Sequence, residues 1–178
     1  MYKRQLQICE PPQGTQSYAL VLEDRDAFAV TPGFSWIHWT AANLQRDFLE
    51  ENESVSARDF VQGVNSWISE GLPLEDCTGY GGMAPPDCPH QYELRVYALD
   101  CLLPLEQGFL YGELYRAMEG HLLDSCCLLY TSDFTGAGLA AGELSHRPPG
   151  KHRLDPLESL LLLRPQRRAG GLLGQLQV

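Results

Sequence analysis

The stretch Gly79–Tyr92 has the sequence GYGGMAPPDCPHQY and runs directly into ELRVYALD. Its glycines allow positive backbone φ angles, whereas Pro85 and Pro86 fix φ and remove two backbone donors. The sequence therefore predicts a stiff loop that delivers His90 and Tyr92 to the first turn of a strand, as the rim of a binding pocket would. An ordinary turn between two strands is the alternative that these residues alone leave open.

Segments with the two-residue period of β-strands lie around this loop. Ser17–Glu23 is apolar on both faces, which predicts a strand buried on both sides. Phe34–Leu44 is a second strand and carries Trp36 and His38 on one face. Gln91–Asp100 alternates most clearly and is the third. We therefore expect a mainly β protein.

Helical spacing follows the third strand. The apolar residues of Leu105–Leu123 recur at the separation of one helical face, at Leu110, Leu114, Ala117 and Met118. Gly120 is a typical residue for the end of such a helix. The sequence therefore predicts one helix beside the strands.

Composition and charge limit the classes of function. The chain has 178 residues, of which 44% are hydrophobic, which is enough for the core of one domain. Its net charge is −10, and residues 6–126 hold 19 acidic but only 5 basic side chains. Such an acidic surface argues against binding to nucleic-acid phosphates and to anionic membranes. The sequence has no apolar run of about 18 residues, so it predicts no membrane span.

Four segments carry a family pattern: SYALVLEDRDA (Ser17–Ala27), FSWIHWTAANL (Phe34–Leu44), GYGGMAPPDCPHQYELRVYALD (Gly79–Asp100) and LYRAMEGHLL (Leu114–Leu123). In this order they resemble the phosphatidylethanolamine-binding protein (PEBP) family, in its bacterial YbhB/YbcL (Raf kinase inhibitor-like) branch. The DPDAP signature of that family corresponds to Asp24–Phe28, which keeps both carboxylates and lacks both prolines. The resemblance implies a PEBP-like antiparallel β-sandwich of Greek-key type with one or two peripheral helices.

The resemblance also implies a ligand site. The residues that match the pocket of the family are Asp24, Asp26, His38, Ala84, Pro85, Pro86, His90 and Tyr92. Two imidazoles, a phenol and backbone N–H groups can bind a small phosphate-type anion or a phosphate headgroup. Asp24 would orient a histidine and complement the amine of a zwitterionic headgroup. We expect a non-catalytic binding module without a cofactor, and relatives in other branches imply a kinase or protease as partner.

The residues by themselves leave other interpretations open. A lone histidine such as His38 on an aromatic strand is more often a hydrogen-bonded core residue, and carboxylates such as Asp24 are more often part of a solvated turn. Two histidines and a carboxylate could also form a metal site or an acid–base pair, as in a hydrolase. The sequence lacks a GxSxG arrangement and strict metal-ligand spacing, which disfavours an enzyme. A truncated fragment without function is the remaining alternative.

The two ends of the chain share an unusual relation. Tyr2–Gln5 can be encoded by DNA whose reverse complement, read one base in, encodes Cys127–Tyr130, as a sequencing adapter present at both ends would. We therefore expect residues 1–5 to be an artefact and residues 6–126 to be a PEBP-like domain that is truncated at both ends. Residues 127–178 would be an adapter scar followed by an unrelated or out-of-frame tail.

The cysteines do not identify the compartment. Cys77 and Cys88 bracket the central loop and could form a disulfide in a secreted homologue. Scattered thiols suit a reduced cytosolic protein equally well, and no CxxC pair suggests zinc. We expect a cytoplasmic protein, with a periplasmic or secreted one as the alternative.

Overall fold

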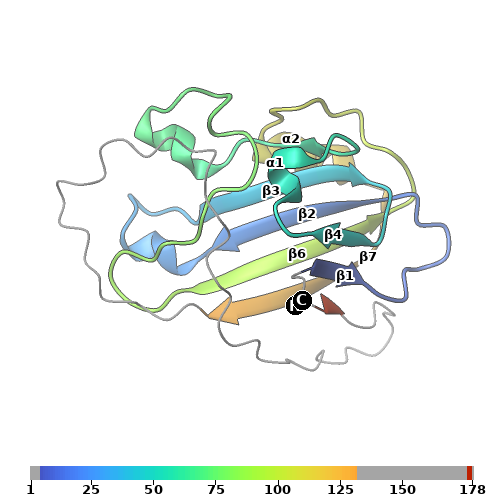
Figure 1. Ribbon diagram of the computed structural model, residues 1–178, viewed down its shortest axis with the longest axis horizontal. Coiled ribbons are helices and arrows are strands. Elements are labelled where there is room, and N and C mark those ends of the chain that lie inside the picture. Colours follow the sequence, from blue (N-terminus) through green and yellow to red (C-terminus); the bar gives the residue numbers. More distant parts are fainter. Residues whose placement is uncertain (1–4, 132–175, 178) are drawn as a thin grey trace.

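The computed structural model describes residues 5–131 and 176–177 (Figure 1). Within these residues the fold is mainly β, with two sheets and two α-helices, as predicted. The elements, in chain order, are β1 (Gln5–Ile8), β2 (Ser17–Asp24), η1 (Asp26–Ala29), β3 (Trp36–Leu44), β4 (Phe48–Glu50), α1 (Glu53–Ser56), β5 (Val61–Gln62), η2 (Ser66–Glu70), β6 (Gln91–Leu99), α2 (Tyr111–Met118), β7 (Leu122–Thr131) and β8 (Leu176–Gln177). None of the described helices is long and apolar enough to cross a membrane.

A five-stranded antiparallel sheet in the order β5-β3-β2-β6-β7 forms the centre of the structure (Figure 1). Its three middle strands are the three predicted ones, with ends that differ by no more than two residues. Strand β2 is buried along its whole length. This burial explains why apolar residues occupy both of its faces, because both faces of the sheet are covered.

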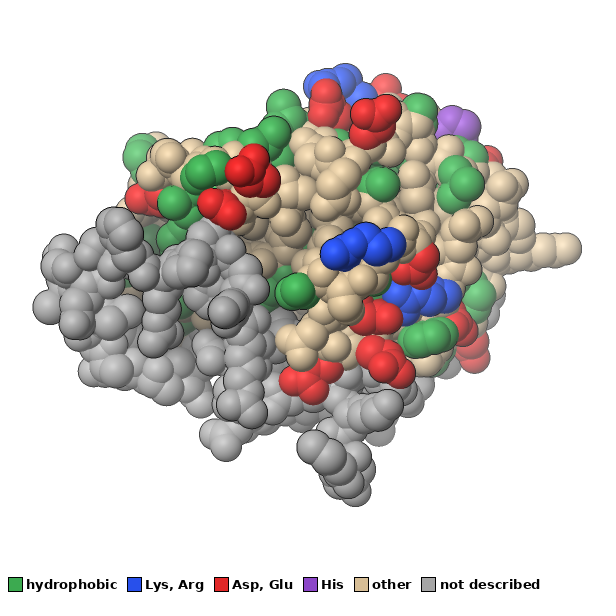
Figure 2. Space-filling view, turned by 45° about the horizontal axis from the view of Figure 1, so that its top comes forward, with side chains coloured by type: hydrophobic (Ala, Val, Ile, Leu, Met, Phe, Trp, Pro, Cys, Tyr) green, Lys and Arg blue, Asp and Glu red, His purple; other side chains and the backbone are tan. Residues whose placement is uncertain are grey.

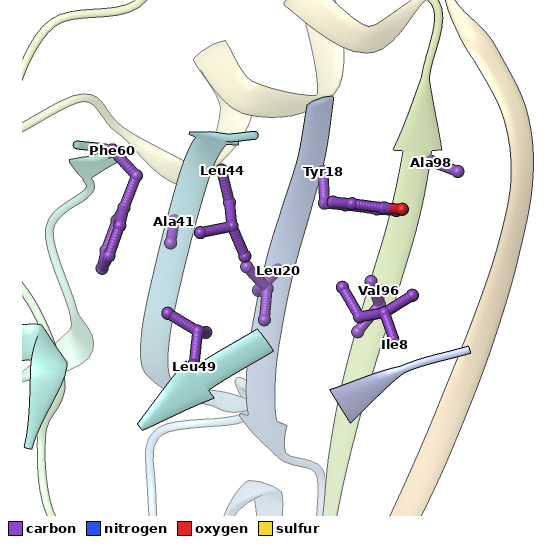
Figure 3. Packing of buried hydrophobic residues seen from close by; sticks show 9 residues of the cluster. All are labelled: Ile8, Tyr18, Leu20, Ala41, Leu44, Leu49, Phe60, Val96 and Ala98. Carbon is purple, nitrogen blue, oxygen red and sulfur yellow. The ribbon is translucent and has the colours of Figure 1, made fainter. Parts of the chain in front are cut away.

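One face of this sheet packs against the smaller sheet β4-β1-β8. Ile8 of β1 and Leu49 of β4 point toward Leu20 and Val96 of the large sheet (Figure 3). The other buried members of this cluster are Tyr18, Ala41, Leu44, Phe60 and Ala98. Burial of apolar surface, worth roughly 25 cal/mol per Å², therefore holds the two sheets face to face.

Helix α2 covers the opposite face. Its Leu114 and Met118 pack with Ala19 and Val21 of β2. These two helical residues are four positions apart and thus share one side of the helix, as the apolar spacing predicts. The alternating side chains of β2 consequently belong to two separate cores, one on each side of the sheet.

The helix is shorter than the predicted Leu105–Leu123. Its start is determined by Glu113, whose carboxylate accepts a hydrogen bond of 2.7 Å from the backbone N–H of Leu110. Gly108, with a φ of +87°, lies just before this cap in a left-handed conformation that interrupts any earlier helical turn. The predicted start was wrong, because the cap outweighs apolar spacing, whereas the predicted end near Gly120 agrees with the observed end at Met118.

Strand β7 was not predicted. It pairs with β6 from Leu99 opposite Leu122 to Gln91 opposite Thr131. Cys127–Tyr130, the suspected adapter-derived element, lie in its second half. The origin of these residues is a question about the DNA, so the boundaries 1–5, 6–126 and 127–178 stay predictions. The tail beyond residue 131 lies outside the described residues, apart from β8.

Candidate functional site

The residues expected to bind a ligand meet at one end of the five-stranded sheet. Strand β2 ends there at Asp24, which pairs with Trp36 at the start of β3 and with Tyr92 at the start of β6. The β2–β3 connection and the long loop before β6 lie at this same end (Figure 1). We call Asp24, His38, Asp87, His90 and Tyr92 the histidine cluster.

His38 reaches the cluster through an irregularity in β3. The register between β2 and β3 shifts between Leu22 and Glu23, at a β-bulge that leaves His38 as the extra residue. His38 is 4% exposed. Its ring meets that of Tyr92 edge-on, with the ring centroids 5.2 Å apart. The bulge therefore turns a core-strand residue toward the site.

His38 is neutral. Its Nδ1 lies 3.0 Å from the carbonyl oxygen of Gly81, and because a carbonyl oxygen only accepts, Nδ1 carries the proton. Burial lowers the pKa of His38, and the hydrogen bond to Gly81 offsets this effect only in part. The lone pair is therefore on Nε2, which can accept a hydrogen bond from a protonated oxyanion or take up a proton when an anion binds.

Gly81 holds the loop against β3. Its backbone N–H donates to the carbonyl oxygen of His38 at 2.7 Å, so two hydrogen bonds join these residues. A Cβ at Gly81 would lie 2.8 Å from the ring of Trp67, which is too close for any side chain. Asn65 fixes the preceding residues, since its Nδ2 donates to the carbonyl oxygen of Gly79 at 3.0 Å. The loop therefore requires glycine at Gly81 for close packing.

The same loop contains no disulfide. Cys77 is buried, Cys88 is exposed, and both are free thiols. Cys77 instead takes part in the loop through its backbone, whose carbonyl oxygen accepts a hydrogen bond of 2.8 Å from the N–H of Asn65. The sequence allowed a disulfide between Cys77 and Cys88 as one alternative. In the structure, backbone hydrogen bonds hold this loop instead.

His90 is buried between two carboxylates, which favour its charged form. Its Nδ1 lies 2.7 Å from Oδ2 of Asp24, its Nε2 lies 2.8 Å from Oδ1 of Asp87, and the residue is 1% exposed. Carboxylates only accept, so both ring nitrogens must be protonated to make both hydrogen bonds. Burial acts to lower the pKa of His90, but the hydrogen bonds and charges of Asp24 and Asp87 outweigh it and raise the pKa.

Asp24 and Asp26 connect the site to the fold. Oδ1 of Asp24 accepts hydrogen bonds from the backbone N–H groups of Asp26 and Ala27, at 3.0 and 3.1 Å. Oδ2 of Asp26 accepts from the backbone N–H of Gln91 at 2.7 Å. The first carboxylate orients His90, as expected from the resemblance. The second, which is exposed, ties the turn after β2 to the start of β6.

Tyr92 lies in the middle of the cluster and is fully buried. Its ring centroid is 5.2 Å from that of His38, 6.5 Å from that of His90 and 6.3 Å from that of Tyr130. The remaining predicted site residues lie on the loop, where Ala84 and Pro86 are exposed and Pro85 is half-buried. The structure thus brings together Asp24, Asp26, His38, His90 and Tyr92 and leaves the other three at the loop surface.

Sequence reasoning missed Asp87 and Gly81. Asp87 precedes His90 by three residues, and this spacing in a proline-rich turn was a usable signal for a contact. The hydrogen bond to His90 lowers the pKa of the Asp87 carboxyl, so this side chain is charged. The role of Gly81 had no comparable signal, because it depends on a ring of η2 that is distant in sequence.

Two groups within the described residues have metal-ligand spacing, Asp87–Cys88–His90 and Asp100–Cys101–His121. Neither contains His38, so the set of two histidines and one carboxylate is not formed. In the first group His90 would have to release a proton that Asp24 stabilises before it could bind a metal ion. A metal ion at this group would therefore have to displace that proton.

A sequence profile described as phosphatidylethanolamine-binding protein matches residues 2–131. The uncharacterised protein YxkA of Bacillus subtilis is 44% identical over 118 residues, which cover 63% of this chain and 70% of that protein. A UPF0098 protein of Chlamydia muridarum is 34% identical over 127 residues, which cover 71% of this chain and 79% of that protein.

Solved structures agree with these sequence matches. A putative PEBP homologue from Chlamydia trachomatis has a TM-score of 0.60 and 32% identity, over 72% of this chain and 79% of that one. YbcL of Escherichia coli, described as a new member of the mammalian PEBP family, has a TM-score of 0.54 and 24% identity, over 68% of this chain and 74% of that one, and its likeness concerns the fold alone. The chain therefore belongs to the phosphatidylethanolamine-binding protein family.

Proposed function

We propose that the histidine cluster binds a small phosphate-type anion or a phosphate headgroup, in a protein that acts as a binding module and not as an enzyme. Membership of the family supports a ligand-binding function. The observation that carries the finer proposal is the contact of 2.8 Å between Nε2 of His90 and Oδ1 of Asp87. In this contact an exposed carboxylate occupies the position that an oxygen of an anionic ligand would take.

The two carboxylates at His90 differ in how firmly they are held. The Asp24 side chain is 5% exposed and accepts two backbone hydrogen bonds besides that of His90. The Asp87 side chain is 44% exposed. Asp87 can therefore turn into water at little cost, while a phosphate oxygen takes over its charge-assisted hydrogen bond to the imidazolium. Asp24 stays in place and keeps His90 charged.

The surroundings favour a small zwitterionic ligand over a polyanion. Asp24, Asp26 and Asp87 lie at the cluster, and residues 6–126 are acidic overall. Figure 2 shows acidic side chains, with a few Lys and Arg side chains among them, on one face of the molecule. An extended polyanion would be repelled by such a surface. A phosphate group that carries an amine can bind His90 while its ammonium pairs with the displaced Asp87 or with the exposed Asp26.

The test is calorimetric titration of the full chain with inorganic phosphate and with phosphoethanolamine. We expect one site, tighter for phosphoethanolamine, and a loss of about tenfold or more in His90→Gln and His38→Gln, because each removes a hydrogen bond to a charged group. Asp87→Asn removes the competing charge and should tighten phosphate binding. Asp59→Asn is the matched control, since Asp59 is an exposed aspartate that pairs with Arg46 instead.

The Asp87→Asn variant keeps the test valid even if the histidine variants misfold. The Asp87 side chain is exposed, and its loss leaves Asp24 to hold His90. Folding of each variant is checked by circular dichroism. Absence of binding to the folded protein and to folded Asp87→Asn would rule out the proposal. So would phosphate affinity that is the same in wild type, Asp87→Asn and folded His90→Gln. A kinase or protease partner rests on the family resemblance and stays a prediction.

A further inference from the structure

A second group of chemically active side chains lies at the other end of β6 and has no part in the proposed function. Asp100 and Cys101 follow β6 directly, and His121 stands between α2 and β7. One ligand atom from each of these three residues lies within 4.8 Å of the other two. We call Asp100, Cys101 and His121 the Asp–Cys–His triad.

Hydrogen bonds fix the backbone that carries the triad. The N–H of Asp100 donates to the carbonyl oxygen of His121 at 3.1 Å, and the N–H of His121 donates to that of Met118 at 3.0 Å. The hydroxyl of Ser17 donates to the carbonyl oxygen of Cys101. Both segments are therefore anchored, and only side-chain rotations remain to adjust the distances between the ligand atoms.

The side chains are arranged to receive a positive charge. Nδ1 of His121 lies 2.9 Å from Oδ1 of Asp100, and both side chains are 47% exposed. Cys101 is half-buried beside them. A cation between these side chains would compensate the charge of Asp100 and that of a Cys101 thiolate.

We propose that the Asp–Cys–His triad binds one zinc ion or a similar thiophilic divalent cation. Zinc takes sulphur, nitrogen and oxygen ligands at about 2.0–2.3 Å in a tetrahedron, which places the ligand atoms about 3.3–3.8 Å apart. The triad atoms all lie within 4.8 Å of one another, so side-chain rotations that bring them about 1 Å closer would give this spacing. Water fills the fourth position. Magnesium and calcium prefer oxygen ligands alone and would not use Cys101.

Binding of the metal ion releases one proton. The S–H bond of Cys101 breaks, the thiolate sulphur bonds to the metal ion, and the proton goes to solvent. The other group with metal-ligand spacing cannot do this as readily, because its His90 is already protonated on both nitrogens between two carboxylates.

The experiment is a titration of the reduced full chain with Co²⁺, which replaces zinc and absorbs strongly when bound to a thiolate. We expect one equivalent of Co²⁺ to produce the thiolate-to-cobalt absorption and Zn²⁺ to remove it. Cys101→Ser should abolish the absorption, and His121→Ala should weaken Co²⁺ binding about tenfold or more. Cys88→Ser and Cys127→Ser are matched controls at exposed cysteines and should retain it.

The absorption reports a sulphur ligand, so metal ions held only by histidines elsewhere in the chain do not contribute. His121 is exposed, and His121→Ala therefore tests the site even where Cys101→Ser fails to fold. The proposal is overturned if the wild type shows no such absorption. It is equally overturned if the absorption persists at full strength in folded Cys101→Ser and in His121→Ala, or if Cys88→Ser alone removes it.

Discussion

The two ends of strand β6 carry the same three residue types in different surroundings. The residues are Asp87, Cys88 and His90 before the strand and Asp100, Cys101 and His121 after it. His90 is 1% exposed between two carboxylates, whereas the His121 side chain is 47% exposed beside one. The two carboxylates favour the charged form of His90 although its burial opposes this, so the charge of His90 belongs to the fold. Because the His121 side chain is exposed, it can exchange Asp100 for another partner.

The strongest test of this comparison is the loss of one aspartate at each end. Asp24→Ala leaves the imidazolium of His90 buried without its main partner and should lower the free energy of unfolding by about 3–5 kcal/mol. Asp100→Ala removes an exposed partner of His121 and should cost less than about 1 kcal/mol. Urea unfolding measures both, through the midpoint at unchanged slope. Equal losses at the two ends would remove the distinction between them.

A smaller effect is expected from glycine substitutions near each end. Gly81→Ala places a Cβ 2.8 Å from the ring of Trp67 and should cost about 1–3 kcal/mol through overpacking. Gly120→Ala meets nothing within 4 Å, and only its φ of +80° penalises it, by about 1 kcal/mol. Thermal unfolding of the two variants shows which substitution lowers the stability more. A larger loss of stability for Gly120→Ala would mean that the loop around Gly81 shifts to accommodate a Cβ at little cost in free energy.

The smallest effect is a pH dependence, in which His90 and His38 act in opposite directions. The raised pKa of His90 gives stability that is complete below its ordinary pKa of about 6.5 and is lost as the pH rises through the raised value. The lowered pKa of His38 gives a loss of stability that begins as the pH falls below about 6.5. Each slope is at most about 1.4 kcal/mol per pH unit.

Unfolding free energies between pH 5 and pH 9, roughly the range over which a histidine can titrate, separate these contributions. His90→Gln should flatten the alkaline side of the profile, and His38→Gln should flatten the acidic side. The difference between each variant and the wild type isolates the histidine from other titrating groups. A His90→Gln profile parallel to that of the wild type would contradict the assignment of a buried imidazolium.

The sequence was sufficient for the part of the fold that depends on apolar periodicity. Strands β2, β3 and β6 were predictable because long alternating or doubly apolar segments admit one arrangement in a sheet. Strand β4, with Phe48–Glu50, is too short to show a period. Strand β7 was excluded because Cys127–Tyr130 were interpreted as adapter-derived. The start of α2 depended on Glu113, a cap that apolar spacing does not reveal.

The sequence predicted which side chains meet at this end of the sheet, while their binding of a ligand stays a prediction. Family resemblance indicated Asp24, His38, His90 and Tyr92, and the structure brings these four together. The protonation of the two histidines could not be predicted, because it depends on burial and on partners. Asp87 was the partner missed. The bulge at His38 has no signature in the sequence, since an extra residue in one strand becomes visible only against its neighbour.

That bulge has a consequence for how this strand can change in evolution. In a regular strand, the loss or gain of one residue would move every later side chain to the other face. In β3 the extra residue His38 separates Trp39–Ala42, whose side chains alternate between the two cores, from Trp36 and Ile37 at the end of the sheet that holds the histidine cluster. A single alternation therefore does not couple the packing of Trp39–Ala42 to the direction of the side chains at the end of the sheet. Substitutions in one half of the strand need not be matched by substitutions in the other.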